Sequence, residues 1–199
     1  MRKARLVIWG VVAATLLVLG ILTLQAPKPA VVQQQGMPVS STFGGSFTLV
    51  GADGQPFGTD ELKGKPYALF FGFTHCPDTC PTTLARLVKL RREAGGDSAF
   101  DIVFVTVDPE RDGPKDMDSY SKAFGAPIIG LTGSRAQIQK VEKQFGIFAE
   151  KVPTGDGDYT MDHTATVLLF DRDGKFLATL APDEQDGPAL DKLKRLTSD

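Results

Sequence analysis

Cysteine, histidine and tryptophan are scarce in this chain of 199 residues, which contains two Cys, two His and one Trp. Two cysteines are too few for a disulfide scaffold of the kind that replaces a hydrophobic core in small secreted domains. An excess of positive charge is also lacking, because the net charge is -2 and the Lys and Arg residues are scattered. We therefore exclude nucleic acid as a partner. The composition, 42% hydrophobic and 23% charged, is that of one soluble domain with an appendage.

Charged residues are absent from residues 6–24, a stretch that follows the basic residues Arg2, Lys3 and Arg5. Its length is roughly what a helix needs to span the hydrocarbon core of a bilayer. Positive charge before the stretch and none directly after it predicts a cytoplasmic N-terminus and an exported remainder. A cleavable signal peptide is the alternative, but its apolar region is usually shorter and residues 24–26 make a poor cleavage site. We expect a membrane anchor at residues 1–25, a single pass through the inner (cytoplasmic) membrane, and a soluble domain in the periplasm.

Residues 26–42 are rich in proline and glutamine and show little apolar periodicity. This composition is typical of a flexible tether. The folded domain is expected to occupy residues 43–199.

Strands and helices are predicted to alternate along this domain. Continuous apolar runs at 66–73 and 101–107 are typical of strands buried on both faces of a sheet. Further strands are expected at 47–50, with a hairpin turn after it, at 127–131, and at 164–170 and 175–180, which flank a turn. Helices are expected from Pro81 to 95, over 115–124, over 134–145 with Ser134 as N-cap, and near the C-terminus. The pattern predicts an α/β fold, a sandwich of the thioredoxin type, behind the N-terminal transmembrane helix.

Both cysteines lie in the short segment between the strand at 66–73 and the helix that follows it. Sites tend to form at this end of a strand in an α/β sheet. Cys76 and Cys80 are four residues apart, close enough to form a redox disulfide or to hold one metal ion. The N-terminal end of the helix favours thiolate over thiol, so a reactive pair is expected. A plain exported disulfide is the alternative, although so short a loop gives little entropic stabilisation.

The two histidines differ in their prospects as metal ligands. His75 adjoins Cys76, but consecutive side chains usually point in different directions, so we do not assign it as a ligand. His163 lies in a predicted loop just before the strand at 164–170, and that loop could bring the imidazole to the cysteines. Two thiolates and one imidazole form a soft set that suits Cu(I) and also accommodates Cu(II). A structural zinc site needs four ligands, which these residues could only just supply.

Three motifs together resemble the Sco/SenC family of copper proteins involved in cytochrome c oxidase assembly. They are Phe73-Thr74-His75-Cys76-Pro77-Asp78-Thr79-Cys80-Pro81, Val105-Thr106-Val107-Asp108-Pro109-Glu110-Arg111-Asp112 and Asp162-His163-Thr164. The resemblance implies a thioredoxin-like fold with copper, Cu(I) or Cu(II), held by Cys76, Cys80 and His163. It also implies that Asp108, which matches an acidic position near the metal, supports the ligands from outside the coordination sphere. The alternative is that Asp108 is a turn residue at the end of a strand, with no role at the metal.

The resemblance implies a copper metallochaperone that serves the dinuclear copper centre of an oxidase subunit. Its expected partners are that copper-bearing subunit, other copper chaperones or thiol reductants, and the membrane. The alternative is a thiol-disulfide oxidoreductase, but usual thioredoxin-like enzymes have two residues between their cysteines rather than three. A peroxidase with one activated Cys is the third candidate. The first two functions can coexist, because a disulfide would exclude copper.

Overall fold

The computed structural model describes residues 43–155 and 157–198. The expected membrane anchor at residues 1–25 and the tether at 26–42 lie outside the described residues. Within the described part of the chain, no helix combines the length and hydropathy needed to cross a bilayer.

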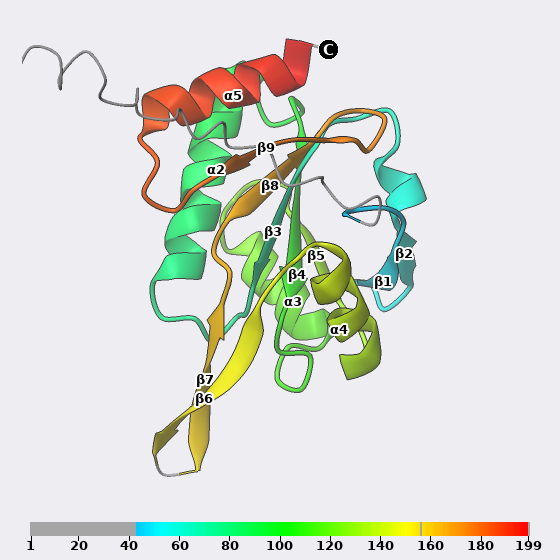
Figure 1. Ribbon diagram of the computed structural model, residues 1–199, viewed down its shortest axis with the longest axis vertical. Helices are drawn as coiled ribbons and strands as arrows, with labels where there is room; N and C mark the ends of the chain where they lie inside the picture. The colour runs from blue at the N-terminus through cyan, green and yellow to red at the C-terminus, as the bar shows by residue number, and fades with distance from the viewer. Residues whose placement is uncertain (1–42, 156, 199) are drawn as a thin grey trace, which may run out of the picture. The chain divides into compact units, whose positions relative to one another are not determined.

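A seven-stranded sheet forms the centre of the domain, in the order β2-β1-β5-β4-β3-β8-β9 (Figure 1). Three central strands run parallel, namely β3 (Tyr67–Gly72), β4 (Asp101–Thr106) and β5 (Ile129–Thr132). Antiparallel strands flank them, namely β1 (Thr48–Gly51), β2 (Pro56–Gly58), β8 (Val167–Phe170) and β9 (Phe176–Leu180). Every residue of β3 is buried, which explains its unbroken apolar sequence.

Helices cover the sheet and connect its strands. They are α2 (Thr79–Gly95), α3 (Pro114–Lys122), α4 (Arg135–Gln144), α5 (Asp186–Ser198) and the short 3-10 helix η1 (Thr59–Leu62). Helices α2 and α5 pack side by side (Figure 1). Consecutive residues of β3 face opposite layers. Phe70 stacks on Phe104, which contacts Tyr120 of α3, whereas Phe71 packs on Phe145 at the end of α4. The result is the mixed α/β sandwich expected from the sequence.

The short helix η1 and the hairpin that follows α4 were not predicted. Strands β6 (Ala149–Gly155) and β7 (Asp158–His163) form a separate two-stranded antiparallel sheet that extends away from the main sheet (Figure 1). The prediction that His163 lies in a loop is therefore wrong, because it is the last residue of β7. Several boundaries also differ: α2 begins at Thr79, before Pro81, the strand predicted at 164–170 begins at Val167, and the strand predicted at 127–131 is Ile129–Thr132.

Candidate metal centre

Three segments bring the predicted ligands together. Cys76 lies in the loop after β3, Cys80 lies in the first turn of α2, and His163 ends β7. The two cysteine sulfurs and one imidazole nitrogen of His163 all lie within 4.8 Å of one another. The loop after β3 and the hairpin are remote in sequence, so the site exists only in the folded chain.

The Cys80 thiol is completely buried. It fits because β3 ends in a glycine: a Cβ on Gly72 would lie only 2.7 Å from Cys80 Sγ. Burial raises the pKa of the Cys80 thiol well above its usual range, with the neighbouring Cys76 adding to the effect. The metal-free protein therefore holds Cys80 as a neutral thiol, which must lose its proton before it can bind a metal ion.

Cys76 is partly exposed, and both cysteines are free thiols. The backbone N–H of Cys80 donates to Cys76 Sγ over 3.3 Å. This N–H belongs to the first turn of α2, where amides have no partner within the helix and stabilise negative charge. The outer sulfur therefore lies at the N-terminal end of a helix, as expected from the sequence. The expectation that this end favours the thiolate is wrong for Cys80, because burial raises the pKa of its thiol.

The imidazole of His163 is oriented by its own main chain. Its Nδ1 lies 3.0 Å from the Thr164 carbonyl oxygen, which can only accept, so Nδ1 carries the proton. The other nitrogen, Nε2, faces Cys80 Sγ at 3.5 Å. Burial lowers the pKa of His163, and the rings of Phe70 and Phe73 lie against the imidazole at 6.3 and 5.8 Å between centroids. A neutral imidazole thus presents its lone pair to the thiols.

This donor set fits a copper ion. Bonds of about 2.3 Å to sulfur and about 2.0 Å to nitrogen, as at zinc, place three donors in a plane about 3.7 Å apart. The separations of 4.8 Å or less are already near that value. Two sulfurs and one nitrogen are a soft, three-coordinate set of the kind that copper accepts, whereas structural zinc takes four ligands.

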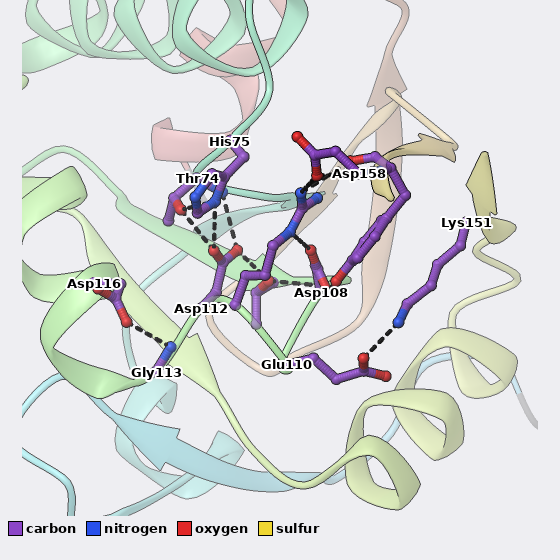
Figure 2. Close-up of polar contacts among 12 residues, drawn as sticks. Thr74, His75, Asp108, Glu110, Asp112, Gly113, Asp116, Lys151 and Asp158 are labelled. Atoms are coloured by element: carbon purple, nitrogen blue, oxygen red, sulfur yellow. Dashed lines mark hydrogen bonds and ion pairs between the residues drawn. The ribbon is translucent and has the colours of Figure 1, made fainter. Parts of the chain in front are cut away.

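His75 is not part of this cluster. Its side chain is 54% exposed, and its Nδ1 lies 3.1 Å from Thr74 Oγ1 and 3.6 Å from Asp112 Oδ1 (Figure 2). The imidazole therefore faces the loop after β4, in keeping with our decision not to assign it as a ligand.

Asp108 is fully buried in the loop that follows β4. Its carboxylate accepts a hydrogen bond from Tyr159 Oη at 2.9 Å and one from Arg111 Nε at 2.5 Å. Tyr159 belongs to β7, so Asp108 contacts the hairpin that carries His163 (Figure 2).

Arg111, Asp112 and Tyr159 were not singled out from the sequence, yet they connect the segments that form the site. Asp112 is completely buried and bonds to Thr74, two residues before Cys76. For Arg111 and Asp112 the available signal was their position: polar residues in the loop after a buried strand lie at the carboxyl edge of the sheet, where sites form. Tyr159 lies inside β7 and had no such signal.

A hollow of about 240 Å³ opens beside the cluster. It is lined by Cys76 and His163 together with neighbours that include Pro77, Thr160 and Met161. Cys80 is not among its lining residues. The candidate site is therefore reached from the side of Cys76 and His163.

Comparisons with known proteins agree with this geometry. The chain matches the family model described as SCO1/SenC over residues 35–198. A "SCO2-like protein" of Rickettsia felis is 37% identical over 179 residues, 87% of each chain. The structure of Bradyrhizobium japonicum ScoI with copper bound is 44% identical, with a TM-score of 0.70 over 77% of this chain and 99% of that one. Arabidopsis thaliana ScoI, also with copper bound, is 32% identical, with a TM-score of 0.74 over 78% and 98%. These similarities confirm the thioredoxin-like α/β fold, and both neighbours hold copper.

Proposed function

This chain belongs to the SCO1/SenC family, and from that premise we propose that it is a copper metallochaperone with Cys76, Cys80 and His163 as its ligands. The observation that carries the proposal is the convergence of two sulfurs and one imidazole nitrogen within 4.8 Å. Copper as the metal is supported by the relatives solved with copper bound and by the softness of the donor set.

The proposed acceptor is the copper-bearing subunit of cytochrome c oxidase, where the ion would enter the dinuclear copper centre. The resemblance of the three motifs to the family supports this role. An open coordination position and a hollow at the site suit ligand exchange, because an acceptor's ligands must reach the ion before the first set releases it. Other copper chaperones are the proposed donors.

Thiol-disulfide exchange remains the second candidate. It is favoured by one observation: Cys76 is a partly exposed thiol whose sulfur lies close to Cys80 and receives an N–H from the start of α2. In this function a Cys76–Cys80 disulfide would exchange with partner thiols, and thiol reductants would restore the pair. A disulfide would also exclude copper, so the redox state of the two cysteines would control whether the chain can load copper.

We also propose that the chain is held in the inner membrane by residues 1–25, with the domain on the periplasmic side. The uncharged stretch behind a basic start supports this arrangement. The full chain should then resist carbonate extraction from membranes, whereas release of a mature protein that starts at about residue 27 would contradict the anchor.

The decisive experiment titrates copper into the reduced protein and repeats the titration with each ligand replaced. One copper ion per chain is expected for the wild type, and Cys76→Ser and Cys80→Ser should each abolish tight binding. His75→Ala is the matched control, because this histidine adjoins a ligand but faces away from the cluster. Full copper loading of Cys80→Ser would overturn the proposal.

A further inference from the structure

The loop between β4 and α3, residues 107–113, lies between the two segments that carry the ligands. Figure 2 shows its acidic side chains directed two ways. Asp112 faces Thr74 and His75 of the cysteine loop, whereas Asp108 and Glu110 face residues of the hairpin. We refer to residues 107–113 as the connecting loop.

Asp112 holds the cysteine loop. Its carboxylate accepts hydrogen bonds from Thr74 N at 2.9 Å, from Thr74 Oγ1 at 2.6 Å and from Thr106 Oγ1 at 2.6 Å. Its backbone oxygen also accepts from Thr132 Oγ1 of β5 at 2.7 Å. A buried carboxylate is tolerated only when such donors surround it. The backbone just before Cys76 is therefore attached to the ends of β4 and β5.

Arg111 holds the hairpin. Its Nη1 donates to the Tyr159 carbonyl oxygen at 2.9 Å, and its guanidinium lies 3.8 Å from the centre of the Tyr159 ring. Asp108 completes the contact, because it accepts both Arg111 Nε and the Tyr159 hydroxyl. Tyr159 precedes His163 by four residues in the same strand, so this contact positions the strand that ends in the imidazole.

The second strand of the hairpin is attached as well. Lys151 of β6 forms an ion pair with Glu110 of the connecting loop and lies 4.4 Å from the centre of the Tyr159 ring. These contacts matter because the hairpin is a two-stranded sheet of its own. Such a sheet is at most marginally stable without packing partners.

We infer that the connecting loop is a positioning element that keeps the two halves of the ligand set at the right separation, with Asp112 acting on the cysteine side and Arg111 on the histidine side. The inference rests on the proposed binding of copper by Cys76, Cys80 and His163. Within the described residues, neither Asp112 nor Arg111 hydrogen-bonds to a ligand side chain. Both are therefore positioning residues.

The first test needs no metal and measures hydrogen exchange in the full reduced chain. Arg111→Met should raise amide exchange in residues 149–163 by about tenfold or more and leave β3 and β4 protected, because only the hairpin loses its attachment. Arg92→Met is the matched control, since this exposed arginine of α2 bonds to Asp97 and to the Gly125 carbonyl oxygen and not to the hairpin. Unchanged exchange in the hairpin, or an equal rise throughout the central sheet, would overturn the inference.

The cysteine side has its own pair of variants. Asp112→Asn should raise exchange at residues 73–77 while the hairpin keeps its protection. Asp118→Asn is its control, because within the described part of the chain that carboxylate pairs with exposed Lys122 alone. If Asp112→Asn does not fold, Thr74→Val removes one hydroxyl donor and leaves the carboxylate in place. No local change in the folded Asp112→Asn, or in Thr74→Val if that variant is needed, would overturn this half of the inference.

The second test asks which ligand each side controls. Arg111→Met should lower the affinity for Cu(II) about 10–100-fold, as the loss of contacts outside the coordination sphere typically does. It should also weaken the imidazole nitrogen coupling in electron paramagnetic resonance, while the affinity for Cu(I) stays within about threefold of wild type. Arg111→Lys keeps the charge beside Asp108 but loses the flat contact with Tyr159, so it should recover part of the loss. Asp112→Asn should instead lower Cu(I) affinity and alter the sulfur-to-copper charge-transfer bands.

The outcomes separate the inference from the proposed function. A wild-type chain that binds no copper would refute the proposed function, whatever the exchange data show. A wild-type chain that binds copper, with both variants identical to it in affinity and spectra, would refute the positioning role alone.

Discussion

Replacement of Gly72 by alanine would place a methyl group in the space that the Cys80 thiol occupies. The added Cβ would lie 2.7 Å from Cys80 Sγ, 2.9 Å from Phe104 Cε2 and 3.3 Å from Phe70 Cε1. All three neighbours are completely buried, so none can turn toward solvent. Overpacking of a core typically costs about 1–3 kcal/mol. We expect the upper part of that range, because two of the contacts are shorter than 3.0 Å.

Thermal unfolding of the reduced, metal-free protein measures this effect. A loss of about 2–3 kcal/mol should lower the Tm by roughly 4–12 °C for a domain of this size. Copper affinity should fall as well, because the added methyl group displaces the buried sulfur. In a Cys80→Ala background the loss from Gly72→Ala should shrink, since one of the clashing groups is gone.

Gly58→Ala is the matched control for Gly72→Ala. It is also a glycine at the end of a strand, but its added Cβ would meet no atom closer than 3.7 Å. The reasoning would be refuted if Gly72→Ala unfolded at the wild-type temperature and bound copper with wild-type affinity.

Three further changes test the site itself. His163→Ala should lower the affinity for Cu(II) by at least about tenfold and keep most of the affinity for Cu(I), because Cu(I) is satisfied by two thiolates. Titration of the variant with each oxidation state checks this. Full Cu(II) binding would remove His163 from the ligand set. Asp108→Ala should weaken copper retention by about one to two orders of magnitude, whereas unchanged affinity and spectrum would leave Asp108 as a strand-ending residue. In the reduced protein Cys76 should alkylate faster than Cys80, whose thiol is buried with a raised pKa, and oxidation to the disulfide should abolish copper loading. Equal loading of both forms would show that the cysteines are not both ligands.

The central layer of the fold was predictable because its sequence signals are local. Strands β3 and β4 are buried on both faces and therefore read as unbroken apolar runs. The hairpin of β6 and β7 gave no such signal. Residues 149–155 are mostly exposed and include Pro153, so neither apolar alternation nor strand propensity marks them. Contacts with the connecting loop stabilise the hairpin, and these depend on residues about fifty positions away.

The candidate ligands were predictable for a related reason. Cysteine and histidine are so scarce here that few sets were possible, and the cysteines share one segment. The residues around them were harder to rank, because aspartates occur throughout the chain. Nothing in the order Asp108-Pro109-Glu110-Arg111-Asp112 says that the first carboxylate faces the hairpin and the last faces the cysteine loop. That division follows from the turn of the backbone after β4.

The unequal exposure of the two cysteines gives any transfer of an ion a direction. Solvent reaches Cys76 and the hollow beside it, whereas Cys80, in the first turn of α2, is buried against the end of β3. In the proposed transfer of copper, an acceptor would approach from the side of Cys76 and His163 and insert its own ligands into the hollow of about 240 Å³. Bonds on the open side would be exchanged first, and the buried sulfur of Cys80 would be the last ligand to release the ion.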